Sequence, residues 1–92
     1  MEEIRKQMAQ VIYRVLSGDM SAGEAIRQYD AEFRPKDDQS IHRAAHALCH
    51  YRDDADIRKK DEEYSERQTT ALKRIADKLA DGLPLSDKEG YW

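Results

Sequence analysis

Apolar residues recur at intervals of three and four along most of the chain, which is the spacing of one face of an α-helix. Four such stripes predict helices over residues 2–17, 21–34, 38–54 and 58–81, and no alternating pattern indicates a β-strand. Short connections favour antiparallel neighbours, beginning with a hairpin of the first two helices. The pattern therefore predicts an all-α fold, a compact antiparallel bundle of four helices in one domain (residues 1–84) with a C-terminal tail (residues 85–92).

Local signals mark where these helices end. Gly18 can adopt the left-handed conformation that closes the first helix, and Ser21 begins a capping-box pattern that starts the second. Pro35 ends the second helix, because proline disfavours helical angles at the preceding Arg34. The third and fourth helices are separated by neither Gly nor Pro, and we place the break within residues 53–57.

Charge and composition narrow the range of partners. Nineteen acidic against sixteen basic residues give a net charge of −3, which argues against direct binding to a nucleic-acid backbone. No stretch approaches the roughly 18 apolar residues of a membrane helix, and no charged-then-apolar leader is present. The single cysteine cannot form an internal disulfide. We therefore expect a cytoplasmic protein with neither nucleic acid nor membrane as a direct partner.

All three histidines and the only cysteine lie close together on the third predicted helix, as His42, His46, Cys49 and His50. Histidines four apart project from successive turns and can bind one Zn²⁺ or a similar divalent metal ion. One ion cannot reach the whole cluster, so acidic residues elsewhere, such as those of the last helix, would complete the site. Alternatively, the histidines occupy an exposed helix face and Cys49 packs at the edge of the core as a small hydrophobic residue.

The same cluster lacks the partners of a catalytic site. Cys49 has histidines beside it, but His46 and His50 share its helix, and neither a third polar group nor a glycine-rich oxyanion loop accompanies them. We therefore assign no catalytic residue and predict that the protein is not an enzyme.

A run of acidic residues with nearby aromatic side chains is the candidate binding surface. Seven acidic residues lie within residues 53–66, interleaved with three basic ones. Such a surface can pair with a basic groove, and Tyr and Trp side chains supply anchors. The predicted partner-binding residues are Tyr51, Asp53, Asp54, Asp56, Asp61, Glu62, Tyr64, Tyr91 and Trp92. Reversing the charge of Asp54 and Asp56 should then slow association while changing stability by less than about 0.5 kcal/mol.

The segment VIYRVLSGDMSAGEAIRQYDAEFR, residues 11–34, resembles the opening of small bacteriocin immunity proteins of the colicin D kind. The shared features are an apolar helix, a short turn, the dipeptide Ser-Ala and a second helix. The resemblance covers about a quarter of the chain and implies an acidic helical bundle that plugs the RNA-binding cleft of a toxin tRNase. The histidine cluster and the run YRDDADIRKKDEEY have no counterpart in it, so no functional residue is transferred from the family.

These observations favour a non-enzymatic, acidic protein-binding module of a bacterium or phage. We predict an immunity- or inhibitor-type protein that blocks a basic site on a nuclease or another nucleic-acid-handling enzyme, without a cofactor. Two alternatives stay open. One is a metal-binding sensor or carrier that holds Zn²⁺ or a similar ion in the histidine–cysteine cluster, and the other is a structural homodimer whose chains complete each other's core.

Overall fold

The computed structural model describes residues 2–86, and this part of the chain contains no β-strand. Its α-helices are α1 (Glu2–Ser17), α2 (Ala22–Gln28), α3 (Gln39–Asp53), α4 (Ala55–Lys60) and α5 (Glu62–Ala80). A π-helical turn, Tyr29–Phe33, and a 3₁₀ turn, Arg34–Lys36, follow α2 directly. The prediction of an all-α fold is confirmed. The predicted count of four helices is wrong, because α4 is a separate helix.

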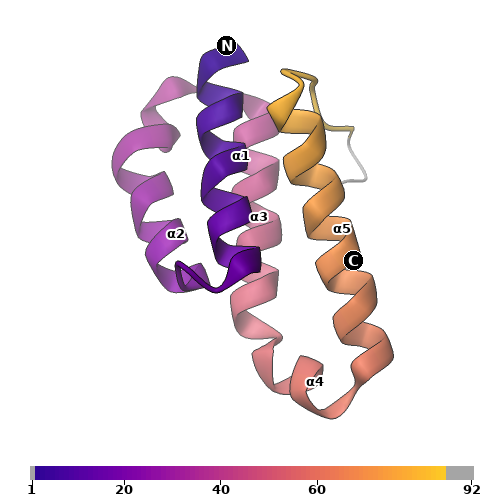
Figure 1. The fold of residues 1–92 in the computed structure, drawn as a ribbon. Coiled ribbons are helices and arrows are strands. Elements are labelled where there is room, and N and C mark those ends of the chain that lie inside the picture. Colours follow the sequence, from indigo (N-terminus) through magenta and orange to yellow (C-terminus); the bar gives the residue numbers. More distant parts are fainter. Residues whose placement is uncertain (1, 87–92) are drawn as a thin grey trace.

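The helices run back and forth along one long axis. In Figure 1, α1 lies between α2 and α5 with α3 behind it, and α4 lies at the far end from the start of α1. α1 packs most extensively against α5, which runs in the opposite direction, whereas α2 packs mainly against α3. The short connection between α1 and α2 does reverse the chain direction. The main packing partner of α1 is nevertheless α5 and not α2.

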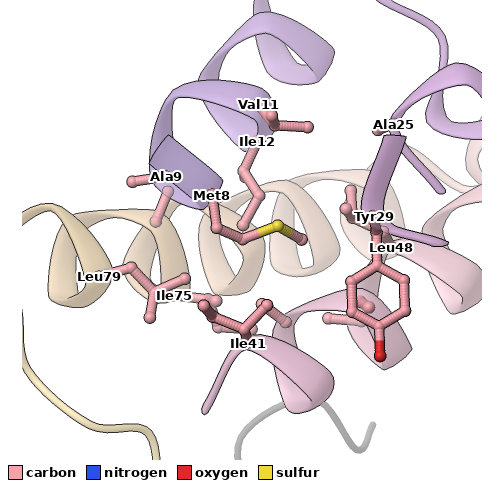
Figure 2. Close-up of a cluster of buried hydrophobic side chains, with 14 of the residues drawn as sticks. Met8, Ala9, Val11, Ile12, Ala25, Tyr29, Ile41, Leu48, Ile75 and Leu79 are labelled. Carbon is pink, nitrogen blue, oxygen red and sulfur yellow. The ribbon is translucent and has the colours of Figure 1, made fainter. Parts of the chain in front are cut away.

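The predicted apolar stripes form the core. Figure 2 shows Met8 and Ile12 of α1 meeting Ile41 of α3 and Ile75 of α5. Burial of one such side chain contributes about 1.5–3 kcal/mol. The largest fully buried apolar side chains are those of Met8, Ile12, Ile41, Leu48, Leu72 and Leu79. Three of the four stripes supply them, so the core joins α1, α3 and α5.

The local signals read for the first two helices are present. Gly18 has a positive φ of 86° after α1, which a glycine adopts without steric strain. The Ser21 hydroxyl oxygen accepts a hydrogen bond from the Glu24 backbone N–H at 3.1 Å and so caps α2. Asp38 caps α3 in the same way, because its carboxylate accepts from the Ser40 backbone N–H at 2.9 Å.

Arg5 joins three helices at the end of the molecule opposite α4. Its Nε donates to Asp38 Oδ2 at 3.0 Å, and its Nη1 donates to the carbonyl of Gly82, just after α5, at 2.9 Å. The Leu85 backbone N–H donates to the Ser40 hydroxyl at 2.9 Å, and the Leu85 side chain is buried. Leu85 therefore packs against the helices, although the sequence pattern places it at the start of the tail.

Pro35 does not end the helical path in the expected way. Arg34 keeps right-handed helical angles (φ −54°, ψ −43°), and its N–H donates to the Tyr29 carbonyl five residues back. The prediction that Pro35 turns Arg34 away from helical angles is therefore wrong. Pro35 lies in the first turn of the 3₁₀ segment, where its missing N–H leaves no helical hydrogen bond unmade, and this segment continues directly from the π-helical turn. This turn also keeps both Tyr29 and Phe33 buried.

Two aspartates interrupt the helical path between α3 and α5. Asp54 lies between α3 and α4, inside the predicted break, and Asp61 separates α4 from α5 with extended angles (φ −131°, ψ 99°). The Asp61 carboxylate accepts from the Tyr64 backbone N–H at 3.0 Å and caps α5. The single last helix predicted over residues 58–81 is therefore wrong, because residues 55–60 form α4.

Candidate protein-binding surface

Residues 53–66 form one end of the molecule, which we call the acidic end. It comprises the last residue of α3, all of α4 and the first turns of α5, at the lower end of the view in Figure 1. Asp54 is half-buried there. Six other acidic side chains are exposed, those of Asp53, Asp56, Asp61, Glu62, Glu63 and Glu66.

The acidic end holds more than the whole net charge of the chain. Its seven acidic and three basic residues give −4, whereas the chain as a whole carries −3, so the remaining residues sum to +1. An excess of one charge at one end of a small protein produces a directional field that steers an oppositely charged partner. The excess negative charge of this protein is therefore localised.

A hydrogen-bonded network fixes the backbone beneath these charges. The Asp54 carboxylate accepts from the Tyr64 hydroxyl at 2.5 Å and from the Gln68 side-chain amide at 3.0 Å. The hydrogen bond to Asp54, with burial as a smaller cause, raises the pKa of Tyr64 above its ordinary value. The break between α3 and α4 is thus held to α5 by two hydrogen bonds to one carboxylate.

Arg58 of α4 completes the network. Its Nη1 donates to the Gln68 side-chain carbonyl at 2.7 Å and to the backbone carbonyl of Tyr51, and its guanidinium lies 3.5 Å from the centre of the Tyr51 ring. Gln68 is only 1% exposed, and no buried side-chain N or O atom within residues 2–86 lacks a partner. A short helix such as α4 is unstable alone, so these contacts keep it in place.

The network changes the role of three predicted partner-binding residues. Tyr51, Asp54 and Tyr64 do lie together, but all three are half-buried and bonded within the protein. Asp54 in particular does not fit the expectation that its charge can be reversed without loss of stability. A lysine there would replace the acceptor shared by Tyr64 and Gln68, and would leave both donors without it.

The other predicted contact residues divide into two groups. Asp56 and Glu62 are exposed, as are Asp53, which pairs with Arg52 Nε at 3.1 Å, and Asp61, which caps α5. These four carboxylates face solvent and can meet a partner. Tyr91 and Trp92 lie outside the described residues, and their part in binding stays a prediction.

Two open hollows lie on α5 beside the acidic end. The smaller, of about 200 Å³, is mostly apolar and is lined by Tyr64, Arg67, Gln68 and Ala71. The larger, of about 410 Å³, shares Arg67 and Ala71 and is lined as well by Glu63, Glu66, Thr70 and Arg74. A hollow next to exposed carboxylates offers an apolar contact for a partner that the charges attract.

The structure divides the histidine–cysteine cluster instead of gathering it. His42 Nδ1 lies 2.6 Å from the Tyr29 hydroxyl, on the side of α3 that meets the π-helical turn. His46 Nε2 and His50 Nε2 lie 3.0 Å from each other, and Cys49 is half-buried. Among the described residues, no group of three or more His, Cys, Asp or Glu side chains is arranged to hold a metal ion. The four candidate ligands therefore do not form one site.

Sequence reasoning missed Arg58 and Gln68, which hold the acidic end together. A signal for Gln68 does exist, because it lies four residues after Tyr64 and four before Leu72, on the apolar stripe of α5. A polar residue on such a stripe is usually hydrogen-bonded inside the protein. Arg58 carries no comparable signal, since it belongs to a run of three basic residues.

Comparison with known proteins identifies no relative. No protein-family model matches the chain, and the searches of curated proteins and of solved structures return no match. The resemblance of residues 11–34 to immunity proteins accordingly rests on those residues alone. None of the helices within residues 2–86 has both the length and the apolar character that a membrane span requires.

Proposed function

We propose that this protein is a non-enzymatic, acidic protein-binding module of the immunity or inhibitor type. Its acidic end occupies a basic site on a nuclease or another nucleic-acid-handling enzyme in the cytoplasm. The observation that carries the proposal is the concentration of charge, −4 within residues 53–66 against +1 for all the rest. A site built to hold phosphates attracts such a surface and repels positively charged ones.

The fixed backbone of the acidic end supports the same proposal. Gln68 holds both Asp54, at the break before α4, and Arg58 of α4, and Asp61 caps α5. These contacts keep α4 against α3 and α5, so the exposed carboxylates are carried on ordered helices. A surface that is already ordered loses little conformational entropy on binding, which favours affinity. The apolar hollow at Tyr64 and Ala71 supplies contact area that charge alone does not.

Inhibition in this mode is competition for a site. The carboxylates of Asp53, Asp56, Asp61 and Glu62 take the place of nucleic-acid phosphates on the basic side chains of the enzyme. The substrate is then excluded while the two proteins stay bound. No bond is made or broken by the inhibitor, so a stoichiometric amount is needed.

The experiment is a capture from extracts of the source cell and of its competitors, with the immobilised chain as bait. A charge-reversed bait, Asp56→Lys with Glu62→Lys, is the matched control. The expected result is a nucleic-acid-handling enzyme that binds the unchanged bait only, and whose activity falls to zero as the inhibitor reaches an equimolar amount. Capture of no such enzyme, or of one whose activity is unaffected, would contradict the proposal. Light scattering of the free protein separates it from the structural homodimer.

A further inference from the structure

The imidazoles of His46 and His50 approach each other on the surface of α3. Their Nε2 atoms are 3.0 Å apart, and the ring centres are 4.6 Å apart with planes inclined at 79°. His46 is exposed and His50 is half-buried, so both rings can be reached from solvent. The spacing of four residues on a continuous helix holds the two rings on the same side.

We infer that His46 and His50 form a two-ligand site for a divalent transition-metal ion such as Zn²⁺ or Ni²⁺. Imidazole nitrogens bind Zn²⁺ at about 2.0–2.1 Å, so two of them on one ion lie about 2.8–3.4 Å apart for angles between about 90° and about 109°. The observed 3.0 Å falls within this range. Imidazole is also a ligand type that suits zinc, copper and nickel.

The metal ion replaces one shared proton. In the metal-free pair, the same distance fits a hydrogen bond in which one Nε2–H donates to the other Nε2. When the ion binds, the proton of the donor ring moves to its Nδ1, and both Nε2 lone pairs face the metal. The coordination of the ion then takes the place of the hydrogen bond between the two rings.

The site contains two of the four residues in the original cluster. His42 lies apart from the pair, because its Nδ1 is 2.6 Å from the Tyr29 hydroxyl, one turn before His46 and toward the π-helical turn. Cys49 lies between the two histidines in sequence, and the inference assigns it no part in binding. The metal site shares no residue with the acidic end, and the inference does not depend on the proposed inhibitor function.

The test is calorimetric titration of Zn²⁺ into the full chain without an affinity tag. We expect one ion per chain. The affinity for Zn²⁺ should fall at least about tenfold in His46→Gln and in His50→Gln, because loss of a group that only supports a metal ligand already costs about that much. His42→Gln and Cys49→Ser are the matched controls on the same helix, and both should bind Zn²⁺ as the unchanged protein does. The thermal unfolding midpoint should rise with Zn²⁺ in the unchanged protein and in both controls, but not in the two glutamine variants.

NMR gives a second readout that a purely structural role would not move. Saturation with Zn²⁺ should shift the ring ¹⁵N signals of His46 and His50 and leave those of His42 in place. Absence of Zn²⁺ binding, binding that survives loss of both histidines, or binding that is lost in Cys49→Ser would each overturn the inference.

Discussion

The side-chain amide of Gln68 donates to the Asp54 carboxylate across 3.0 Å and so joins the interior of α5 to the break between α3 and α4. The carbonyl oxygen of the same amide accepts from Arg58 at 2.7 Å. One buried group therefore holds a negative and a positive side chain in place beneath the acidic end. A carboxylate or an amine at position 68 could satisfy only one of them.

Replacement of Gln68 by leucine should lower the free energy of unfolding by about 2 kcal/mol. The change leaves Arg58 without its side-chain acceptor and Asp54 with one donor fewer, and each unsatisfied group costs about 1–3 kcal/mol when buried, less where water can reach it. Urea unfolding measures the effect. Thr70→Ala, an exposed substitution on the same helix, should change the value by no more than about 0.5 kcal/mol. Equal stability of both variants would contradict the structural role of the amide.

Charge reversal at the acidic end should slow binding to an identified partner. We expect Asp56→Lys with Glu62→Lys to reduce the association rate constant by about tenfold at low salt and to weaken its dependence on ionic strength. Glu3→Lys with Glu32→Lys makes the same change of charge on exposed residues outside the acidic end and is the matched control. Stopped-flow measurements over a range of salt concentrations make the comparison. A similar fall of the association rate constant in both double variants would show that binding depends on the net charge of the protein and not on the acidic end.

Loss of the Arg5 side chain should destabilise the opposite end of the molecule. Arg5→Gln removes the cation beside Asp38, which is 2% exposed, and breaking a buried ion pair costs about 3–5 kcal/mol. We expect about 3 kcal/mol, because the arginine itself stays partly accessible to water. Lys6→Gln, the exposed neighbour on α1, removes the same charge and should have little effect. Unfolding in denaturant compares the two variants.

The hydrogen bond between Tyr13 and Asp77 should make stability depend on pH in acid. The Tyr13 hydroxyl donates to Asp77 Oδ1 at 2.5 Å, and this bond, followed by that from Lys73, holds the pKa of Asp77 below its ordinary value. The unfolded chain therefore takes up the proton first. The contribution to stability is complete above the ordinary pKa of aspartate, about 3.9, and is lost as the pH falls through the lowered value.

The same pair should act in the opposite direction in alkali. Burial, with the hydrogen bond to Asp77 next, raises the pKa of Tyr13 to about 12 from 10.0. The unfolded chain then loses its proton first, so this contribution is complete below pH 10 and is lost as the pH rises toward 12. Tyr13→Phe removes the alkaline effect and the part of the acid effect that comes from the tyrosine hydroxyl, while Lys73 still lowers the pKa of Asp77. It should cost about 1 kcal/mol at pH 7, and its difference from the unchanged protein should shrink below pH 4 and above pH 10. A difference that stays constant with pH would contradict the assignment.

Much of the fold could be predicted from periodicity, because burial of apolar residues dominates helix packing. Met8, Ile12, Ile41 and Leu72 lie on predicted stripes and are fully buried. The two breaks in the helical path between α3 and α5 were less predictable. Asp54 and Asp61 interrupt helices without glycine or proline, and the physical cause lies in side-chain hydrogen bonds to residues further along the chain, which a linear pattern does not reveal.

The candidate site shows the same limit. Exposure of Asp56 and Glu62 follows from their charge, but Tyr51 and Tyr64 look like interface anchors until Arg58 and Asp54 are seen to hold them. The histidines share one helix face by spacing alone. Their separation into His42 with Tyr29, and His46 with His50, depends on the packing of α2 and the π-helical turn against α3.

The pairing of α1 with α5 has a consequence for synthesis of the chain. Because α1 finds its principal neighbour in α5, a nascent chain of residues 1–60 leaves exposed the side of α1 that α5 covers in the folded protein. Closure of the core around Met8 and Leu79 must await translation of the final third. Nascent chains stalled before that point should therefore be bound by chaperones or cut by proteases, whereas full-length chains should resist both.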